Sequence, residues 1–400
     1  MRVCMLSYSY YESDNRVRRY AETLAQNGNS VDVIAIGMKG CPKSEVIKNV
    51  KLYRIQSRVR NEKRKIDYLL RILLFLFKSA IYLMFKHIHS PYSLIHVHSV
   101  PDFEVFAAIF PKLTGAKVIL DIHDIVPEFY AGKFKKGKNN IIIKLLIYIE
   151  RICCKFANHV IISNDLWRKV LTDRSVDETK CTSIINYPDS NIFKRMTPKS
   201  ENVNRPFIAI YPGTLNYHQG LDIAVKAIHR VKKITNNIQF HIYGIGPSLL
   251  EIEKMITELD IEENVFLKGA ISLEMVAQKM ADADLGIVPK RADGFGNEAF
   301  STKICEFMMM GIPVIAAETK IDRYYFNDSI IEFFKPGDEE SLAQKIILLY
   351  NDKKRRDELI KNALSYITEN SWDNMKYKYL DIVDRLCGFQ KSPELEIQKS

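Results

Sequence analysis

Residues 1–37 read MRVCMLSYSYYESDNRVRRYAETLAQNGNSVDVIAIG, and this stretch decides the fold class. Its apolar run at 3–6 and the run VDVIAI at 31–36 are both typical of buried strands. Between them, apolar residues recur at the spacing of one helix face, and Asp14 is a suitable N-cap for that helix. The stretch therefore predicts a right-handed βαβ unit in a parallel sheet.

Strand-like and helical patterns alternate through the rest of the chain. Three further apolar runs in the first half are typical of buried strands: 94–98, 116–121 and 159–163. Residues 187–206 contain three prolines and little apolar periodicity, as a linker does. A second alternating series then runs from 207 to 316, and the chain closes with three helical patterns: 338–350, 352–368 and 371–387.

These two series predict an α/β protein with two tandem Rossmann-like doubly wound parallel-sheet domains and an interdomain cleft. We expect the domains to span 1–195 and 205–370, with the helix at about 371–388 packing back on the first. A length of 400 residues suits two domains of ~100–200 residues each. Ligands of such sheets bind beyond the carboxyl ends of the strands, so we expect the functional site in the cleft.

Charge is distributed unevenly between the two halves. Residues 1–200 carry 33 basic and 18 acidic side chains (+15), whereas residues 201–400 carry 25 and 30 (5 net negative). Arg64, Arg71 and Lys78 repeat every seven residues on an otherwise apolar helical pattern at 58–88. Such a helix can lie against an anionic membrane surface, and packing on the domain sheet is the alternative. Basic and aromatic residues do not interleave on a strand, so we expect no nucleic acid partner.

The seven cysteines form no C-x-x-C pair and no Cys/His cluster at zinc spacing, which indicates reduced thiols. The N-terminal apolar run is too short for a signal peptide, and no run of 18 uncharged apolar residues predicts a membrane span. We therefore expect a cytoplasmic protein, peripheral on the inner face of the cell membrane.

The stretch DGFGNEAFSTKICEFMMMGIPVIA, residues 293–316, is the most informative about function. Ser301 is placed to cap a helix that begins at Thr302, so the first amides and the helix dipole form an anion site. Glu298 lies in the loop before this helix and Glu306 one turn inside it. A carboxylate there can accept hydrogen bonds from the diol of a ribose or hexose.

A second group of polar residues follows the strand expected at 116–121. His123 and Asp124 come just beyond its end, where α/β domains expose functional groups. We expect Asp124 to orient the imidazole of His123, and Asp121 only to finish the strand. On the acceptor side we place four further residues, with a structural role left open for the first: His98, Asp102, Asp14 and Arg16.

The order and spacing of these segments resemble the retaining glycosyltransferases of family 4, which have the GT-B fold. The resemblance covers nearly the whole chain and includes HVHSVPDF (96–103), DIHDIVPE (121–128), YPGTLNYHQGLD (211–222) and HIYGIGP (241–247). It implies transfer of a sugar from a UDP- or GDP-linked donor to a lipid-linked or polysaccharide-precursor acceptor in cell-surface glycan synthesis. Retention of anomeric configuration, without a metal or other cofactor, is implied as well.

The resemblance also implies residue roles. Glu306 holds the ribose hydroxyls of the donor, Glu298 contacts hydroxyls of the transferred hexose, and His123 lies near the anomeric carbon. The main chain at four positions binds the diphosphate: Phe300, Ser301, Thr302 and Lys303. Loops of the second domain supply the remaining donor contacts: Gly213, Thr214, Gln219 and Gly244.

The chain departs from the family at the diphosphate. Many relatives carry an arginine and a lysine where this chain has Thr214 and Gln219. Charge compensation must then come from helix amides, or from one of three cations: Lys303, Lys290 or Arg291. Two alternatives therefore stay open, a GT-B-fold sugar-nucleotide epimerase and a catalytically silent nucleotide-sugar-binding protein.

One further motif is weaker. Asp282 and Asp284 form a D-x-D sequence typical of some metal sites, but they fall at a helix end before a strand, where capping is the simpler interpretation. We expect no metal site there.

Overall fold

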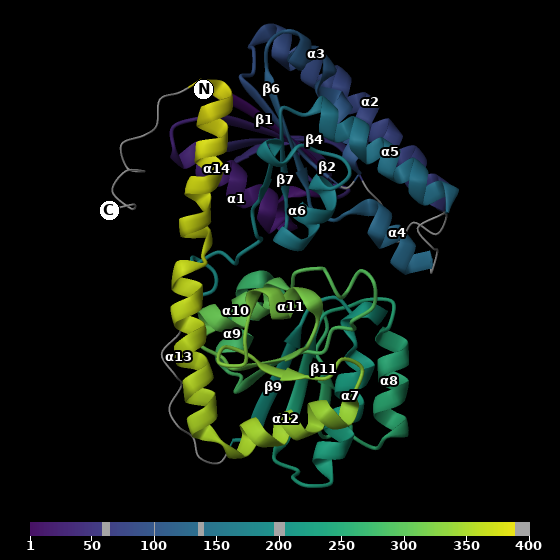
Figure 1. Ribbon diagram of the computed structural model, residues 1–400, viewed down its shortest axis with the longest axis vertical. Helices are drawn as coiled ribbons and strands as arrows, with labels where there is room; N and C mark the ends of the chain where they lie inside the picture. The colour runs from purple at the N-terminus through teal and green to yellow at the C-terminus, as the bar shows by residue number, and fades with distance from the viewer. Residues whose placement is uncertain (58–64, 100, 135–139, 196–204, 389–400) are drawn as a thin grey trace. The chain divides into compact units, whose positions relative to one another are not determined.

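The computed structural model describes residues 1–57, 65–99, 101–134, 140–195 and 205–388 (Figure 1). By its internal contacts the chain divides into two units, and each is described by itself. Unit 1 comprises Met1–Asn186 together with Asp373–Ser400, and unit 2 comprises Tyr187–Trp372. The first boundary falls at Asn186, ahead of residue 195, and the last helix belongs to unit 1.

Unit 1 is built on an eight-stranded sheet in the order β3-β4-β2-β1-β5-β6-β7-β8. All neighbours are parallel except the β3–β4 pair. The strands are β1 (Arg2–Tyr10), β2 (Ser30–Gly37), β3 (Ser44–Ile47), β4 (Val50–Ser57), β5 (Leu94–His98), β6 (Lys117–Ile122), β7 (His159–Ile162) and β8 (Cys181–Ser183).

Helices cover both faces of this sheet (Figure 1). They are α1 (Asn15–Gln26), α2 (Lys65–His89), α3 (Ile109–Leu113), α4 (Val126–Phe134), α5 (Ile141–Phe156), α6 (Asp165–Thr172) and α14 (Trp372–Cys387), with 3-10 turns η1 (Tyr11–Ser13), η2 (Asp102–Ala108) and η3 (Glu178–Lys180). Helix α1 begins as expected, because the Asp14 side chain accepts a hydrogen bond from the Val17 amide at 3.2 Å.

Unit 2 is built on a six-stranded parallel sheet in the order β11-β10-β9-β12-β13-β14. Its strands are β9 (Phe207–Pro212), β10 (Ile238–Tyr243), β11 (Val265–Leu267), β12 (Leu285–Val288), β13 (Val314–Ala317) and β14 (Glu332–Phe334). Its helical elements are η4 (Tyr217–Gln219), α7 (Leu221–Lys232), α8 (Leu249–Glu258), α9 (Leu273–Ala281), α10 (Thr302–Met310), α11 (Lys320–Tyr325), α12 (Glu339–Asn351) and α13 (Lys353–Glu369).

Both sheets contain the same reversal of strand order, which positions the site. In unit 1 the chain moves outward from β1 to β2 and β4, then returns to β5 on the other side of β1. In unit 2 it moves from β9 to β10 and β11, then returns to β12 beside β9. Ligands of open α/β sheets bind at the carboxyl ends of the strands where this reversal occurs. The predicted fold, two doubly wound α/β units, is confirmed.

Four strands were missed: β3, β4, β8 and β14. In strand β4, which lies next to the sheet edge, two cations interrupt the apolar run: Lys51 is exposed, and Arg54 is buried and paired with Glu12 and Glu45. Strands β8 and β14 have three residues each and both lie at sheet edges, so they are too short to produce a periodic pattern.

Candidate active site

The first group of functional side chains lies at the carboxyl ends of β5 and β6 in unit 1. His98 ends β5, Asp121 is the next-to-last residue of β6, and His123 follows that strand directly. The parallel register pairs His98 with Asp121 across the two strands. Arg16 reaches the same place from the first turn of α1, which follows the neighbouring β1.

Asp121 is the centre of this group. Its Oδ1 accepts from Arg16 Nη2 at 2.7 Å and its Oδ2 from Arg16 Nε at 2.8 Å, which is a bidentate pair. Oδ2 also lies 3.1 Å from His98 Nδ1 and 3.2 Å from His123 Nε2. Burial alone would raise the pKa of Asp121, but the attraction of Arg16 and then of His123 holds it well below its usual value. The buried carboxylate is therefore ionised.

The expected pairing of His123 with Asp124 is wrong. The imidazole of His123 contacts Asp121, and within the described residues no hydrogen bond joins it to Asp124. Asp121 does more than end a strand, because its side chain turns toward the α1 start where Arg16 and His123 both reach it. Burial raises the pKa of Asp124, and the attraction of His123 and then of Arg16 offsets this only in part.

Of the four residues that we assigned to the acceptor side, Arg16 and His98 contact Asp121. Arg16 and His98 are 5% and 1% exposed and are bound to Asp121, so their side chains act within the protein. Asp14 caps α1 beside them. Asp102 is also buried, but it lies on η2 and forms no hydrogen bond to His98 among the described residues; burial, with the nearby Glu150, raises its pKa to about 7.

His96 belongs to the cluster and was not predicted. Its ring stacks on that of His98 with centroids 4.1 Å apart, and its Nδ1 lies 3.0 Å from the hydroxyl of Tyr379 on α14. Two histidines at i and i+2 of a strand face the same side, so the HVH pattern contained a signal. Tyr379 is 283 residues away in sequence, and its contact with His96 is a product of the fold alone.

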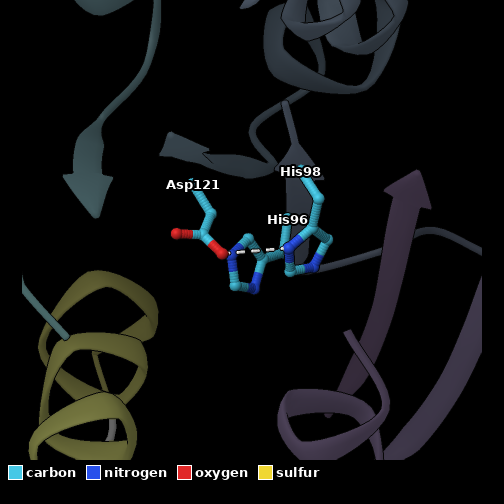
Figure 2. Close-up of side chains that lie close together, drawn as sticks. All are labelled: His96, His98 and Asp121. Atoms are coloured by element: carbon cyan, nitrogen blue, oxygen red, sulfur yellow. Dashed lines mark hydrogen bonds and ion pairs between the residues drawn. The ribbon is translucent and has the colours of Figure 1, made fainter. Parts of the chain in front are cut away.

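Figure 2 shows His96, His98 and Asp121 with ligand-type atoms within 4.8 Å of one another, a grouping that suits a metal ion by residue type. The contacts favour a hydrogen-bonded network instead. Asp121 is already neutralised by a bidentate arginine, and a cation added there would meet the guanidinium of Arg16. Burial lowers the pKa of both histidines, so they are neutral members of the network.

The second group lies in unit 2, where three loops follow the adjacent strands β9, β10 and β12. The first two loops are joined through their backbones: the Gly213 amide donates to Tyr243 and the Leu215 amide to Ile245. Gly244 has φ +151°, and a Cβ there would lie 1.8 Å from the carbonyl oxygen of Gly213. Only glycine allows this approach, so the loops form a surface lined by main chain.

The third loop contains Glu298 and leads into α10, which contains Glu306. Ser301 occupies the N-cap position, but its side chain makes no capping hydrogen bond, so the expected capping role of the hydroxyl is wrong. The helix has nine residues and its first amides are not capped by that side chain. An anion can therefore bind there, as the sequence predicted.

Lys303 lies in the first turn of α10 against the glycine loop. A Cβ on Gly213 would meet its Cε at 2.3 Å, and its Nζ lies 5.3 Å from the ring centre of Tyr211. Burial lowers the pKa of Lys303, partly offset by Glu306 one turn on. Within the described residues, no carboxylate is in ion-pair distance of it.

The other two candidate cations have partners. Lys290 is buried, binds Asp322 at 3.0 Å and donates to the carbonyl of Ala299 at 2.8 Å. Arg291 pairs with Asp222 and stacks over the ring of Tyr217 at 4.2 Å. Both ion pairs hold the third loop in place, so neither cation is free to replace the missing arginine and lysine.

Thr214 and Gln219, which stand where many relatives have the arginine and the lysine, both contact Tyr211. Its hydroxyl lies 3.0 Å from the carbonyl oxygen of Thr214 and 3.1 Å from Oε1 of Gln219. Gly220 follows with φ +67°, and a Cβ there would lie 2.0 Å from the carbonyl oxygen of Pro289. Gln219 and Gly220 therefore hold the first loop against the third.

The remaining motif residues surround α10. Glu298 accepts from Lys320 Nζ at 2.7 Å, and that lysine is largely exposed. Phe300 packs edge-to-face on Tyr325 with ring centroids 5.2 Å apart. Asp284 of the D-x-D sequence binds Arg205 and the Ile208 amide, which gives it a structural partner.

Two family models match the chain: "Glycosyltransferase Family 4" over residues 14–187 and "Glycosyl transferases group 1" over residues 193–366. Together they cover the sheet of unit 2, the sheet of unit 1 except β1, and the side chains of both groups except Tyr379. The chain belongs to the family 4 glycosyltransferases of GT-B fold.

Known proteins agree with this membership. A phosphatidylinositol N-acetylglucosaminyltransferase subunit of Schizosaccharomyces pombe is 23% identical over 300 residues, which are 74% of this chain and 61% of that protein. Sucrose-phosphate synthase of Thermosynechococcus elongatus has the same fold with a TM-score of 0.78, at 16% identity over 96% of this chain and 99% of its own. HepE of Anabaena, solved in complex with UDP-glucose, gives a TM-score of 0.73 at 15% identity over 96% and 100%.

Proposed function

We propose that this protein is a retaining, metal-independent glycosyltransferase that moves a sugar from a nucleotide diphosphate donor to a lipid-linked or polysaccharide-precursor acceptor. Curated relatives are glycosyltransferases of lipid-anchor, polysaccharide and cell-wall glycan synthesis. The observation that carries the proposal is the start of α10, where an open helix N-terminus, a glycine-lined backbone surface and an unpaired lysine converge. Such a place suits a diphosphate.

In the proposed reaction, unit 2 binds the donor. The amides of Thr302 and Lys303 and the ammonium of Lys303 receive the diphosphate, and Glu306 receives the ribose hydroxyls. Glu298 accepts from a hexose hydroxyl, in exchange for its surface contact with Lys320. Tyr211 binds Gln219 and the carbonyl oxygen of Thr214, and its ring lies beside Lys303.

The chemistry breaks the bond between the anomeric carbon and the diphosphate oxygen and forms a bond to the acceptor oxygen. Charge that develops on the leaving diphosphate is stabilised by the helix terminus and Lys303. The acceptor hydroxyl loses its proton to the departing phosphate oxygen on the same face of the sugar, which gives retention. His123 supports the positive charge that develops at the anomeric carbon. The epimerase and the silent binding protein are not favoured by the relatives.

Unit 1 also presents a broad apolar surface. Helix α2 buries one stripe, including Phe75 and Leu83, and exposes the opposite face. Both α2 and α5 pack against η2, and both expose large apolar side chains. On α2 these are Leu69, Leu70, Leu73, Leu74, Phe77, Ile81, Phe85 and Ile88, and on α5 they are Ile141, Ile142, Leu145, Tyr148 and Ile152.

We propose that this surface lies in the interface of an anionic membrane, on the cytoplasmic side, where a lipid-linked acceptor would be met. By length and composition Asp67–His89 is apolar enough to cross a membrane, although Arg71 and Lys78 interrupt the apolar run. The buried stripe favours the interfacial position, because Phe75 packs on Tyr8 of β1 with ring centroids 5.1 Å apart. Arg64 lies outside the described residues, and so do residues 135–138 of a second basic stretch predicted from the sequence, KFKKGK at 133–138.

A panel of nucleotide sugars, incubated with and without a lipid-linked saccharide, tests the proposal. Transfer only with acceptor present, with the anomeric configuration kept and with activity unchanged by EDTA, is the expected result. Product formed from the donor alone would show an epimerase. Calorimetry with UDP and GDP is the companion measurement: undiminished binding by Glu306→Ala would overturn the donor-site assignment. Flotation with anionic vesicles tests the membrane surface, and equal activity on water-soluble acceptors without vesicle binding would remove it.

A further inference from the structure

Arg16 and Asp121 form a buried pair whose geometry is fully specified. The side chain of Asp121 is 0% exposed and that of Arg16 5%. Two of the arginine's nitrogens hold the two carboxylate oxygens, and the third, Nη1, donates to the carbonyl of Ile184 at 2.8 Å. A bidentate guanidinium fixes the plane of a carboxylate, which a single hydrogen bond does not. Asp121 can therefore present its Oδ2 in only one direction.

His123 meets that oxygen through one ring nitrogen. Its Nε2 lies 3.2 Å from Oδ2, and its backbone carbonyl accepts from the Ser163 hydroxyl at 2.8 Å. The side chain stays 23% exposed, and among the described residues Nδ1 has no hydrogen-bond partner. An Nε2–H that is donated to Asp121 leaves Nδ1 as the accessible edge of the ring.

We infer that Arg16 and Asp121 are positioning residues, which lock His123 with its Nε2–H on the carboxylate and its Nδ1 toward the sugar that is transferred. The inference rests on the proposed function for its substrate, but the lock itself is a property of unit 1. From the sequence we expected Arg16 on the acceptor side and Asp121 only at a strand end. The inference instead has both residues act through His123.

The charges around the imidazole agree with this lock. Burial would lower the pKa of His123, but attraction by Asp121 and the hydrogen bond to it, with a contribution from Asp14, raise it, while Arg16 opposes. His98 and His96 are neutral neighbours, and Asp124 is the remaining carboxyl in the same loop. The direction of this pKa shift agrees with an Nε2–H that is held on the ionised carboxylate of Asp121.

The first test needs no substrate. Nitrogen-15 spectra of the histidine side chains in the full chain should show His123 protonated on Nε2 when neutral, with a pKa above the ordinary value. Asp121→Asn should lower that pKa below the ordinary value and mix the two neutral forms. Asp32→Asn is the matched control, because it removes a buried carboxylate paired with Arg2 elsewhere in the same sheet. An unchanged His123 spectrum in Asp121→Asn would overturn the inference.

The second test measures turnover of the donor that the panel of nucleotide sugars identifies. Asp121→Asn should reduce kcat about 100-fold with little change in donor KM. In a His123→Ala background the same substitution should cost less than about twofold, because its target is gone. An equal loss in both backgrounds would mean that Asp121 acts independently of His123 and would overturn the inference.

A buried Arg16 left without its partner can prevent folding. The double variant Arg16→Gln/Asp121→Asn removes both charges and keeps hydrogen-bonding side chains, so it is the folded comparison. It should show the same loss of the Nε2-bound form. If the wild-type protein turns over no nucleotide sugar, the proposed function fails, and the spectra still decide the lock.

Discussion

The two units place their functional groups at the same topological position and build them from different materials. In unit 1 the site consists of side chains: a buried arginine, a carboxylate and three imidazoles that are joined by hydrogen bonds and ring stacking. In unit 2 it consists mainly of backbone: glycine loops in van der Waals contact, an open helix end and Lys303.

This difference suits the roles that we propose for the two sites. A group that acts on a reacting carbon must be held in one orientation, and interlocked ionic hydrogen bonds do this. A diphosphate is large and highly charged, and many backbone amides can share its charge without a fixed side-chain geometry. The comparison therefore predicts that substitutions in unit 1 change turnover and substitutions in unit 2 change donor affinity or stability.

The largest expected effect is on turnover. His123→Ala should lower kcat about 1,000-fold while donor affinity stays within about threefold, because the imidazole supports charge that exists only in the transition state. Steady-state kinetics, with calorimetry of nucleotide binding, measures both. A loss that fell on donor affinity instead would place His123 at the ground-state donor and weaken the comparison.

The backbone construction of unit 2 should show in its stability. Gly244→Ala should destabilise unit 2 by about 3 kcal/mol, because its Cβ would overlap the Gly213 carbonyl in addition to the cost of positive φ. Gly269→Ala is the control: it shares a positive φ, but nothing lies within 4 Å of the added Cβ, so about 1 kcal/mol is expected. Denaturant unfolding measures both, and equal losses would show that the loop contact is not tight.

Donor affinity should depend on Lys303. Lys303→Met keeps the aliphatic contact with Gly213 and removes the charge, so nucleotide diphosphate binding should weaken about 30-fold, and less at high salt. Lys335→Met, at a lysine that is 78% exposed in the same unit, should change binding less than twofold. If Lys303→Met binds UDP and GDP like wild type, helix amides alone compensate the diphosphate charge.

The smallest expected effect is on how the stability of unit 1 depends on pH. Glu104 is buried, neither of its carboxyl oxygens has a hydrogen-bond partner in the part of the chain that the structure describes, and burial raises its pKa to about 8. The folded state thus keeps a proton that the unfolded chain releases above about pH 4.3, so stability falls as pH rises toward 8. Glu104→Gln should reduce this loss by about 1 kcal/mol, as thermal unfolding at pH 5 and pH 8 would show. Glu178→Gln, at an exposed glutamate, is the control, and the same slope in both variants would contradict the assignment.

Much of the fold was predictable because it depends on local patterns. The strand at Leu94–His98 was predicted with its observed bounds and the helix at Thr302–Met310 with its observed start, since a buried run and an amphipathic segment are both visible within ten residues. The short edge strands were not, because pairing with a neighbour and not a local pattern makes them strands.

The candidate sites were predictable only in part. The sequence by itself determined two doubly wound units, the start of a helix at Thr302 and a histidine just beyond β6, because local patterns fix where strands end and helices begin. Only the tertiary structure decided which carboxylate meets His123, which cation stays unpaired, and that Tyr379 reaches His96. The first two of these choices depend on ion pairs between residues more than 65 positions apart, such as Arg16 with Asp121 and Arg291 with Asp222. Such pairs form only when folding brings opposite charges together.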